Sequence, residues 1–266
     1  MDVDTGTDML LARVDDGIGW LTYNNPARLN AITMAMHLAV PVALRAFDTD
    51  PAVRVIVVHG AGGKAFVSGA DISEFEQKRT SPWARAEYDR AAGESWASWG
   101  RIDTPVLAMI QGFCVGGGLL TAMQADIRMC GEGSQFGVPA ARLGLGYEFR
   151  GVEQLIELVG PSWAAEILFS ARRLDAHEAE RIGLVNRVLP ADELESAVRE
   201  LADTIAANAP LTIRASKVAI REALKDRDAR DMDAVDAAVE ACFRSEDYVE
   251  GQRAFMDKRQ PHFKGV

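Results

Sequence analysis

The first part of the chain alternates between short apolar runs and stretches with helical spacing. Residues 9–14 and 18–23 flank Asp15-Asp16-Gly17, a turn signal, and predict a β-hairpin. Apolar runs rich in β-branched residues predict buried strands further on. The strands expected after the hairpin are 53–58, 106–110, 127–130 and 184–188.

Capping residues place helices between these strands. Thr33 is expected to cap a helix that runs to about residue 47, with a kink or a break at Pro41. Ser81-Pro82 marks the start of the longer of two helices expected in 72–101, and Asp175 caps a short helix. The other helices predicted before residue 190 are 119–125, 152–159 and 163–169.

After Pro190 the spacing is almost entirely helical. The expected helices are 191–208, 211–225, 231–244 and 247–258. Because strands and helices alternate before this point and only helices follow it, the predicted fold class is α/β with a helical C-terminal region. We assign residues 1–200 to the core and residues 201–266 to the helical region.

A glycine-rich turn joins the strand at 106–110 to the helix at 119–125. Gly112 ends the strand, and three consecutive glycines, 116–118, open the helix. A helix N-terminus has unpaired backbone N–H groups and a positive dipole end, and glycine lets a ligand approach the backbone closely. The turn is therefore a candidate for binding a phosphate or for stabilising an oxyanion. The alternative is a tight turn that only packs the helix on the strand.

Composition narrows the class of protein. The chain has 266 residues, of which 48% are hydrophobic, and a net charge of −10. This charge disfavours nucleic-acid binding, which needs a cationic face. No apolar run reaches membrane-spanning length, and the acidic N-terminus does not resemble a signal peptide. Three cysteines without paired spacing indicate neither a disulfide framework nor a zinc site. We expect a cytoplasmic protein with no membrane or nucleic-acid partner and no bound metal.

Common catalytic motifs fit poorly. Gly60-x-Gly62 after a strand resembles part of a dinucleotide fingerprint, but the residues that follow do not continue a helical face. No phosphate-binding P-loop is present, and Ser68 lacks the glycine two residues earlier that a nucleophile elbow needs. The four histidines are scattered along the chain.

Several segments taken in order resemble the crotonase superfamily, the enoyl-CoA hydratases and isomerases. The resemblance covers nearly the whole chain and includes its C-terminal tail. The segments are Asn25-Pro-Ala-Arg-Leu-Asn-Ala31, Phe66-Val-Ser-Gly-Ala-Asp-Ile72, Pro105-Val-Leu-Ala-Met-Ile-Gln-Gly-Phe-Cys-Val-Gly-Gly-Gly118, Ala125-Asp-Ile127, Phe136-Gly-Val-Pro139, Ser245-Glu-Asp-Tyr-Val-Glu-Gly251 and Ala254-Phe-Met-Asp-Lys-Arg-Gln-Pro-His-Phe263.

This resemblance implies a spiral of ββα units with a helical trimerisation region, assembled as a homotrimer or a dimer of trimers. It implies an acyl-CoA substrate and no cofactor other than the coenzyme A that the substrate carries. The backbone N–H groups of Ala70 and Gly117 would form the oxyanion hole that polarises the thioester. The residues expected to bind coenzyme A are Arg28, Ser68, Asp71 and Ile72, with Lys258, Phe263 and Lys264 from a neighbouring subunit.

The chain departs from the family pattern at the hydratase glutamates. By resemblance, Leu120 and Ala140 occupy their two places, and neither side chain can transfer a proton. Glu148 falls where related isomerases and dehalogenases have an aspartate, and Tyr147 falls where a related decarboxylase has a tyrosine. We expect Glu148 to be the acid/base, with a pKa raised in an apolar pocket of Leu120, Ala140 and Phe149, and Tyr147 to assist it. The alternative is that Glu148 is a surface acid beside Arg150.

A single carboxylate can carry a proton between two carbons of an enolate, so the expected reaction is double-bond isomerisation. Three alternatives remain: hydration by atypical residues, decarboxylation or C–C bond cleavage, and acyl-CoA binding without catalysis. Ala70 stands in place of a histidine of the decarboxylase, which weakens that alternative. Three tryptophans, Trp83, Trp96 and Trp99, are expected either to shape the acyl pocket or to belong to the core.

Overall fold

The computed structural model describes residues 1–71, 73–74 and 81–266, and in these residues the larger of two sheets has seven strands. Their order is β1-β2-β3-β4-β6-β8-β11; β1, β2 and β3 pair in antiparallel fashion, and the later neighbours are parallel. The predicted hairpin is confirmed as β2 and β3. The strands are β1 (Asp2–Val3), β2 (Leu10–Asp15), β3 (Ile18–Tyr23), β4 (Val55–Gly60), β6 (Val106–Ile110), β8 (Ile127–Gly131) and β11 (Arg187–Leu189).

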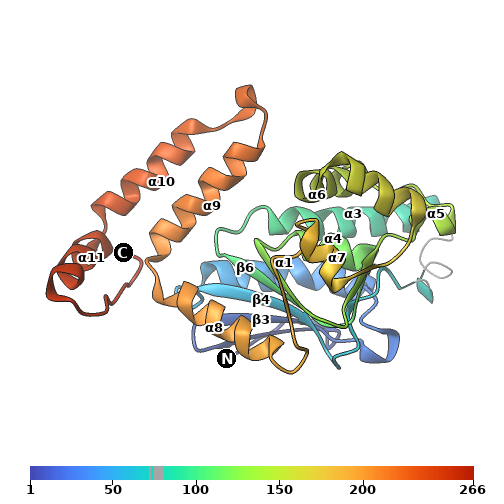
Figure 1. Ribbon diagram of the computed structural model, residues 1–266, viewed down its shortest axis with the longest axis horizontal. Helices are drawn as coiled ribbons and strands as arrows, with labels where there is room; N and C mark the ends of the chain where they lie inside the picture. Colours follow the sequence, from blue (N-terminus) through green and yellow to red (C-terminus); the bar gives the residue numbers. More distant parts are fainter. Residues whose placement is uncertain (72, 75–80) are drawn as a thin grey trace.

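Helices cover both faces of this sheet, which explains why β4 is apolar at consecutive positions. Ile56 and Val58 of β4 belong to the main core, whereas Val55 and Val57 pack in a second cluster with Leu194 of α8. Figure 1 shows α8 on one side of the sheet and α1, α3, α4 and α6 on the other. These helices, together with α7, are α1 (Met34–Thr49), α3 (Pro82–Trp99), α4 (Gly117–Met123), α6 (Phe149–Ser170), α7 (Ala176–Arg181) and α8 (Leu194–Ala207).

A smaller sheet carries the turns that the sequence identified. Its strand order is β10-β9-β7-β5, and β5, β7 and β9 run parallel to one another. Carboxyl ends of parallel strands lie at one edge of a sheet, so the chain leaving these three strands arrives in one place. The elements are β5 (Ala65–Val67), β7 (Phe113–Val115), β9 (Gln135–Gly137) and β10 (Leu174–Asp175), and α5 (Ala140–Leu143) follows β9.

The C-terminal helices form an arm beside the core, as Figure 1 shows. In the arm, α9 (Pro210–Leu224) and α10 (Met232–Arg244) pack against each other, and α11 (Glu246–Asp257) follows them. The predicted boundary between the core and the helical region, at residue 200, lies inside α8. The boundary itself stays a prediction. Two short 3-10 helices are η1 (Pro26–Arg28) and η2 (Arg227–Ala229). Across the described ranges, no helix combines the length and apolarity that crossing a membrane requires.

Local rules predicted most boundaries, with two corrections. Helix α1 continues through Pro41, although a kink or break was expected there; buried residues on both sides of the proline, including Val40 and Leu44, hold the helix against the core. The strand expected at 184–188 begins only at Arg187. The Leu184 and Val185 N–H groups instead bond to the Ala179 carbonyl at the end of α7.

Close backbone packing explains Gly118, the third glycine of the turn. A Cβ at this position would lie 1.9 Å from the Val67 carbonyl oxygen of β5. Gly118→Ala should therefore lower the free energy of unfolding by about 1–3 kcal/mol, measured by chemical denaturation. Gly93→Ala is the control, because Gly93 lies within α3 and a Cβ there meets nothing within 4 Å. We expect that change to be neutral or stabilising, and equal effects of the two substitutions would contradict the packing explanation.

Candidate active site

Ala70 and Gly117 are neighbours because each follows one of two adjacent parallel strands. Ala70 comes three residues after the end of β5, and Gly117 comes two residues after the end of β7. A Cβ built on Gly117 would lie 3.7 Å from the Ala70 nitrogen. The structure therefore places side by side the two backbone positions that the sequence analysis assigned to an oxyanion hole.

The backbone pairing of Ile32 with Ala70 leaves the Ala70 N–H group pointing away from Ile32. The Ile32 N–H donates to the Gly69 carbonyl at 2.7 Å, and the Asp71 N–H donates to the Ile32 carbonyl at 2.9 Å. Successive residues of an extended chain point their N–H groups to opposite sides, so the Ala70 N–H faces the other way. Within the described residues it donates no backbone hydrogen bond.

The Gly117 N–H is the first donor of α4. The preceding residue, Gly116, has φ 56° and ψ −116°, a conformation that side chains disfavour. The Gly116 N–H is bonded to the Gly137 carbonyl at 2.8 Å, which fixes the turn against β9. No hydrogen bond among the described residues uses the Gly117 N–H, as expected in the first turn of a helix. Two backbone N–H groups with no hydrogen-bond partner among the described residues thus lie at one edge of the smaller sheet.

A polar cluster lies beside this pair. Arg28 Nη1 is 3.2 Å from Asp71 Oδ1 and donates to Ser73 Oγ at 2.6 Å. Burial acts to raise the pKa of Asp71, but hydrogen bonds from Ser73 and the Arg28 charge outweigh it and lower that pKa. Ser68 Oγ donates to the Arg28 carbonyl at 3.4 Å. The structure thus brings Arg28, Ser68 and Asp71 together; Ile72, also predicted to bind coenzyme A, lies outside the described residues.

Tyr147 reaches this edge from the loop after α5. Its ring lies beside Gly151, where a Cβ would be 2.7 Å from the ring and 3.4 Å from Leu120 Cδ1. The hydroxyl is buried and has no hydrogen-bond partner in the described part of the chain. Burial raises the pKa of Tyr147, and the nearby Cys114 and Glu148 act in the same direction. The side chain is therefore a neutral donor at working pH.

Glu148 differs from expectation in its surroundings. It occupies the N-cap position of α6, yet its side chain makes no capping hydrogen bond and is exposed. Phe149, expected to shelter it, is 76% exposed. The apolar pocket predicted around the carboxylate is therefore not formed within the single chain. Among the described residues, no ion pair joins Glu148 to Arg150, so the expected neighbour does not hold the carboxylate either.

The predicted contacts at the C-terminus are not near Arg28. Lys258 follows α11, Phe263 lies against Gly251 of that helix, and the Lys264 N–H donates to Asp247 at 2.7 Å. Figure 1 shows α11 and the C-terminus on the arm, away from α5. A single chain therefore does not bring these three residues to the cluster.

The tryptophans divide between surface and core. Trp96 and Trp99 are buried in the main core, which was one of the two expectations for the tryptophans, whereas Trp83 is 75% exposed at the start of α3. Two residues that organise the site were not identified from sequence. Ser73 had a detectable signal, because a serine two residues after an aspartate is typical of a turn closed by the carboxylate. Ile32 had none, since its contribution is made by the backbone.

Comparisons with known proteins show what this chain is similar to. Residues 13–266 match the sequence model of a family described as enoyl-CoA hydratase/isomerase. The chain is 34% identical over 254 residues to a crotonyl-CoA hydratase of Syntrophomonas wolfei, covering 96% of this chain and 97% of that one. It is 34% identical to a short-chain-enoyl-CoA hydratase of Clostridium acetobutylicum, over 90% of this chain and 91% of the other.

A solved structure shows the same likeness. The crystal structure of an enoyl-CoA hydratase/carnithine racemase from Magnetospirillum magneticum superposes with a TM-score of 0.90 at 33% identity. The match covers 98% of this chain and 97% of that one. The shared architecture therefore extends over both the core and the arm.

Proposed function

The chain belongs to the enoyl-CoA hydratase/isomerase family, whose crotonase-type fold it shares, and we propose that it isomerises a double bond of an acyl-CoA thioester. The observation that carries this proposal is the pair of N–H groups on Ala70 and Gly117, which have no hydrogen-bond partner among the described residues. Both would donate to the thioester oxygen as it becomes an enolate oxygen. Fixed donors of this kind stabilise developing charge without reorganising during the reaction.

Glu148 is the proposed acid/base. It would remove a proton from one carbon of the acyl chain and return it to another, so that one carboxylate suffices. Leu120 and Ala140, in the places assigned to the hydratase glutamates, offer no second titratable group. The carboxylate is exposed in the single chain, so its shelter would come from the bound substrate and a neighbouring subunit. Tyr147, held neutral by burial, would supply a hydrogen-bond donor nearby.

Arg28 is proposed to contact a phosphate of coenzyme A, since its side chain is 56% exposed and its guanidinium is oriented by Asp71. Arg28→Ala should weaken coenzyme A binding about tenfold, equivalent to about 1.4 kcal/mol, measured by isothermal titration. Arg181→Ala, which removes an exposed arginine paired with Glu178, is the control and should leave the dissociation constant unchanged. An Arg28→Ala protein with wild-type affinity would remove Arg28 from the binding site.

We propose a homotrimer or a dimer of trimers, with Lys258, Phe263 and Lys264 covering the nucleotide of a neighbouring subunit. Large apolar side chains exposed on the arm support an assembly that buries them. They include Phe243, Val249, Phe255 and Met256, exposed by 58%, 55%, 86% and 81%. The proposed reaction needs no cofactor beyond the coenzyme A of the substrate.

Hydration is the second candidate, favoured by the names of the relatives. Product analysis separates the two: isomerisation moves a double bond and conserves mass, whereas hydration of crotonyl-CoA adds one water and removes the enoyl absorbance. A mass spectrum of the product showing the addition of water would replace isomerisation with hydration. Coenzyme A binding without turnover of any thioester would instead indicate a non-catalytic binder.

A further inference from the structure

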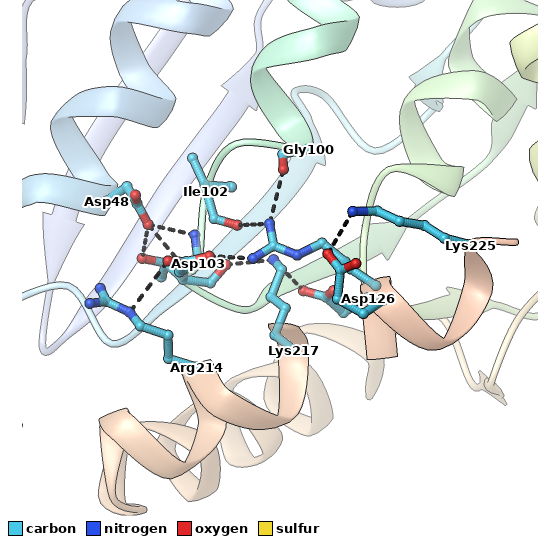
Figure 2. Close-up of polar contacts among 11 residues, drawn as sticks. Asp48, Gly100, Ile102, Asp103, Asp126, Arg214, Lys217 and Lys225 are labelled. Atoms are coloured by element: carbon cyan, nitrogen blue, oxygen red, sulfur yellow. Dashed lines mark hydrogen bonds and ion pairs between the residues drawn. The ribbon is translucent and has the colours of Figure 1, made fainter. Parts of the chain in front are cut away.

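Helix α9 joins the arm to the core through basic side chains on one face. Arg214, Lys217 and Arg221 are spaced by three and four residues, which places them on the same side of a helix. Arg221 donates to two backbone carbonyls in the loop 100–102 and pairs with Asp103, and Arg214 Nε lies 3.7 Å from the same carboxylate. Figure 2 shows these contacts converging on the loop that leads into β6.

Lys217 is the buried member of this set. Only 9% of the residue is exposed, and its Nζ donates to the Thr104 carbonyl at 2.8 Å and to Asp126 Oδ2 at 2.9 Å. A buried ammonium group is costly unless it is paired and hydrogen-bonded, so these partners define where the side chain can lie. Figure 2 shows Lys217 pointing from α9 toward Asp126.

Asp126 closes a loop that contains the proposed oxyanion donor. Its Oδ2 accepts the Val106 N–H at 2.7 Å, and its own N–H donates to the Val106 carbonyl at 2.9 Å. Val106 begins β6, and Asp126 comes three residues after the end of α4. The chain between them includes β7 and the turn with Gly117, so both ends of this segment meet at one carboxylate.

We propose that Lys217 is a positioning residue for the reaction. Lys217 fixes Asp126, Asp126 fixes the C-terminal end of α4, and α4 in turn sets the position of the Gly117 N–H at its other end. The inference rests on the function proposed above for that N–H group. Because α4 has seven residues, only about 10 Å separate its two ends. A displacement of about 1 Å at a reacting group can cost about 100-fold in rate. The docking of the arm is thereby coupled to the geometry of the site.

Hydrogen–deuterium exchange measured by mass spectrometry tests this coupling without requiring turnover. Lys217→Met removes the ammonium and keeps the aliphatic stem. We expect faster exchange in peptides covering 117–126, a fall in kcat for α-proton exchange of about tenfold or more, and a KM within about twofold. Lys217→Arg should restore part of kcat. The matched control is Lys225→Met, which should change neither readout, since Lys225 pairs with Glu222 of the arm at 2.6 Å.

Each outcome decides the matter. Faster exchange confined to α9, with peptides 117–126 and kcat unchanged, would show that Lys217 only attaches the arm and would overturn the proposal. If Lys217→Met does not fold, Asp126→Asn is used for the same measurements. Its amide oxygen can still accept a hydrogen bond from the Val106 N–H, but the negative charge that faces Lys217 is removed. If wild type turns over no thioester, the proposed function fails, while the exchange of peptides 117–126 still decides the role of Lys217.

Discussion

Replacing Glu148 by glutamine is expected to lower the rate of α-proton exchange by about 100- to 10,000-fold. An amide of the same shape cannot accept the proton, and no second carboxylate is assigned an acid/base role in the site. The measurement is NMR of an acyl-CoA thioester in deuterated water with enzyme and variant side by side. Because the side chain is exposed and makes no capping bond, the variant should fold and bind coenzyme A as wild type does.

A neighbouring carboxylate supplies the matched control. Glu153 is exposed five residues further along α6, and Glu153→Gln should leave the exchange rate within about twofold of wild type. If Glu148→Gln retains full exchange, Glu148 is not the base, and the acid/base must be sought elsewhere along the same edge of the sheet.

Gly117→Pro is expected to cost about 100- to 1000-fold in the rate of the same reaction. Proline removes the N–H group that is proposed to bind the enolate oxygen. It is tolerated at the first position of a helix, which is where Gly117 lies in α4, so the fold should survive. Circular dichroism and the size of the assembly would verify that it does.

Gly117→Ala separates the loss of the donor from the added bulk. Its Cβ would lie 3.5 Å from Ile32 Cδ1 and 3.7 Å from the Ala70 nitrogen, both ordinary contacts, and the N–H is kept. We expect a much smaller loss than for proline. A crystal structure with bound acyl-CoA provides the geometric check: the thioester oxygen should lie about 2.7–3.1 Å from both nitrogens. An oxygen far from either nitrogen would refute the oxyanion hole.

Much of the fold was predictable because local signals and the tertiary structure agree. Thr33, Ser81 and Asp175 cap the helices that they were expected to cap, and the left-handed φ of 77° at Gly160 divides α6 between the two helices predicted at 152–159 and 163–169. The short strands of the smaller sheet were not predicted; β7, for example, has three residues between glycines and pairs with strands distant in the sequence.

The site was predictable where the backbone carries it and less so where side-chain surroundings do. Ala70 and Gly117 were identified through the resemblance, and the pairing of β5 with β7 brings them together. Whether the Glu148 carboxylate is buried depends on the substrate or subunit that covers this surface, and the residues next to it in the sequence do not determine its burial. The burial of Lys217 could not be predicted for a similar reason, because nothing in the sequence distinguishes it from the other basic residues of an amphipathic helix.

The most direct test of the account is α-proton exchange by the wild-type protein, followed by NMR in deuterated water over a panel of saturated and unsaturated acyl-CoA thioesters. We predict exchange on at least one thioester, since a donor pair and a base that form an enolate must exchange this proton. Absence of exchange on every thioester that the protein binds would contradict the enolate chemistry proposed for Ala70, Gly117 and Glu148.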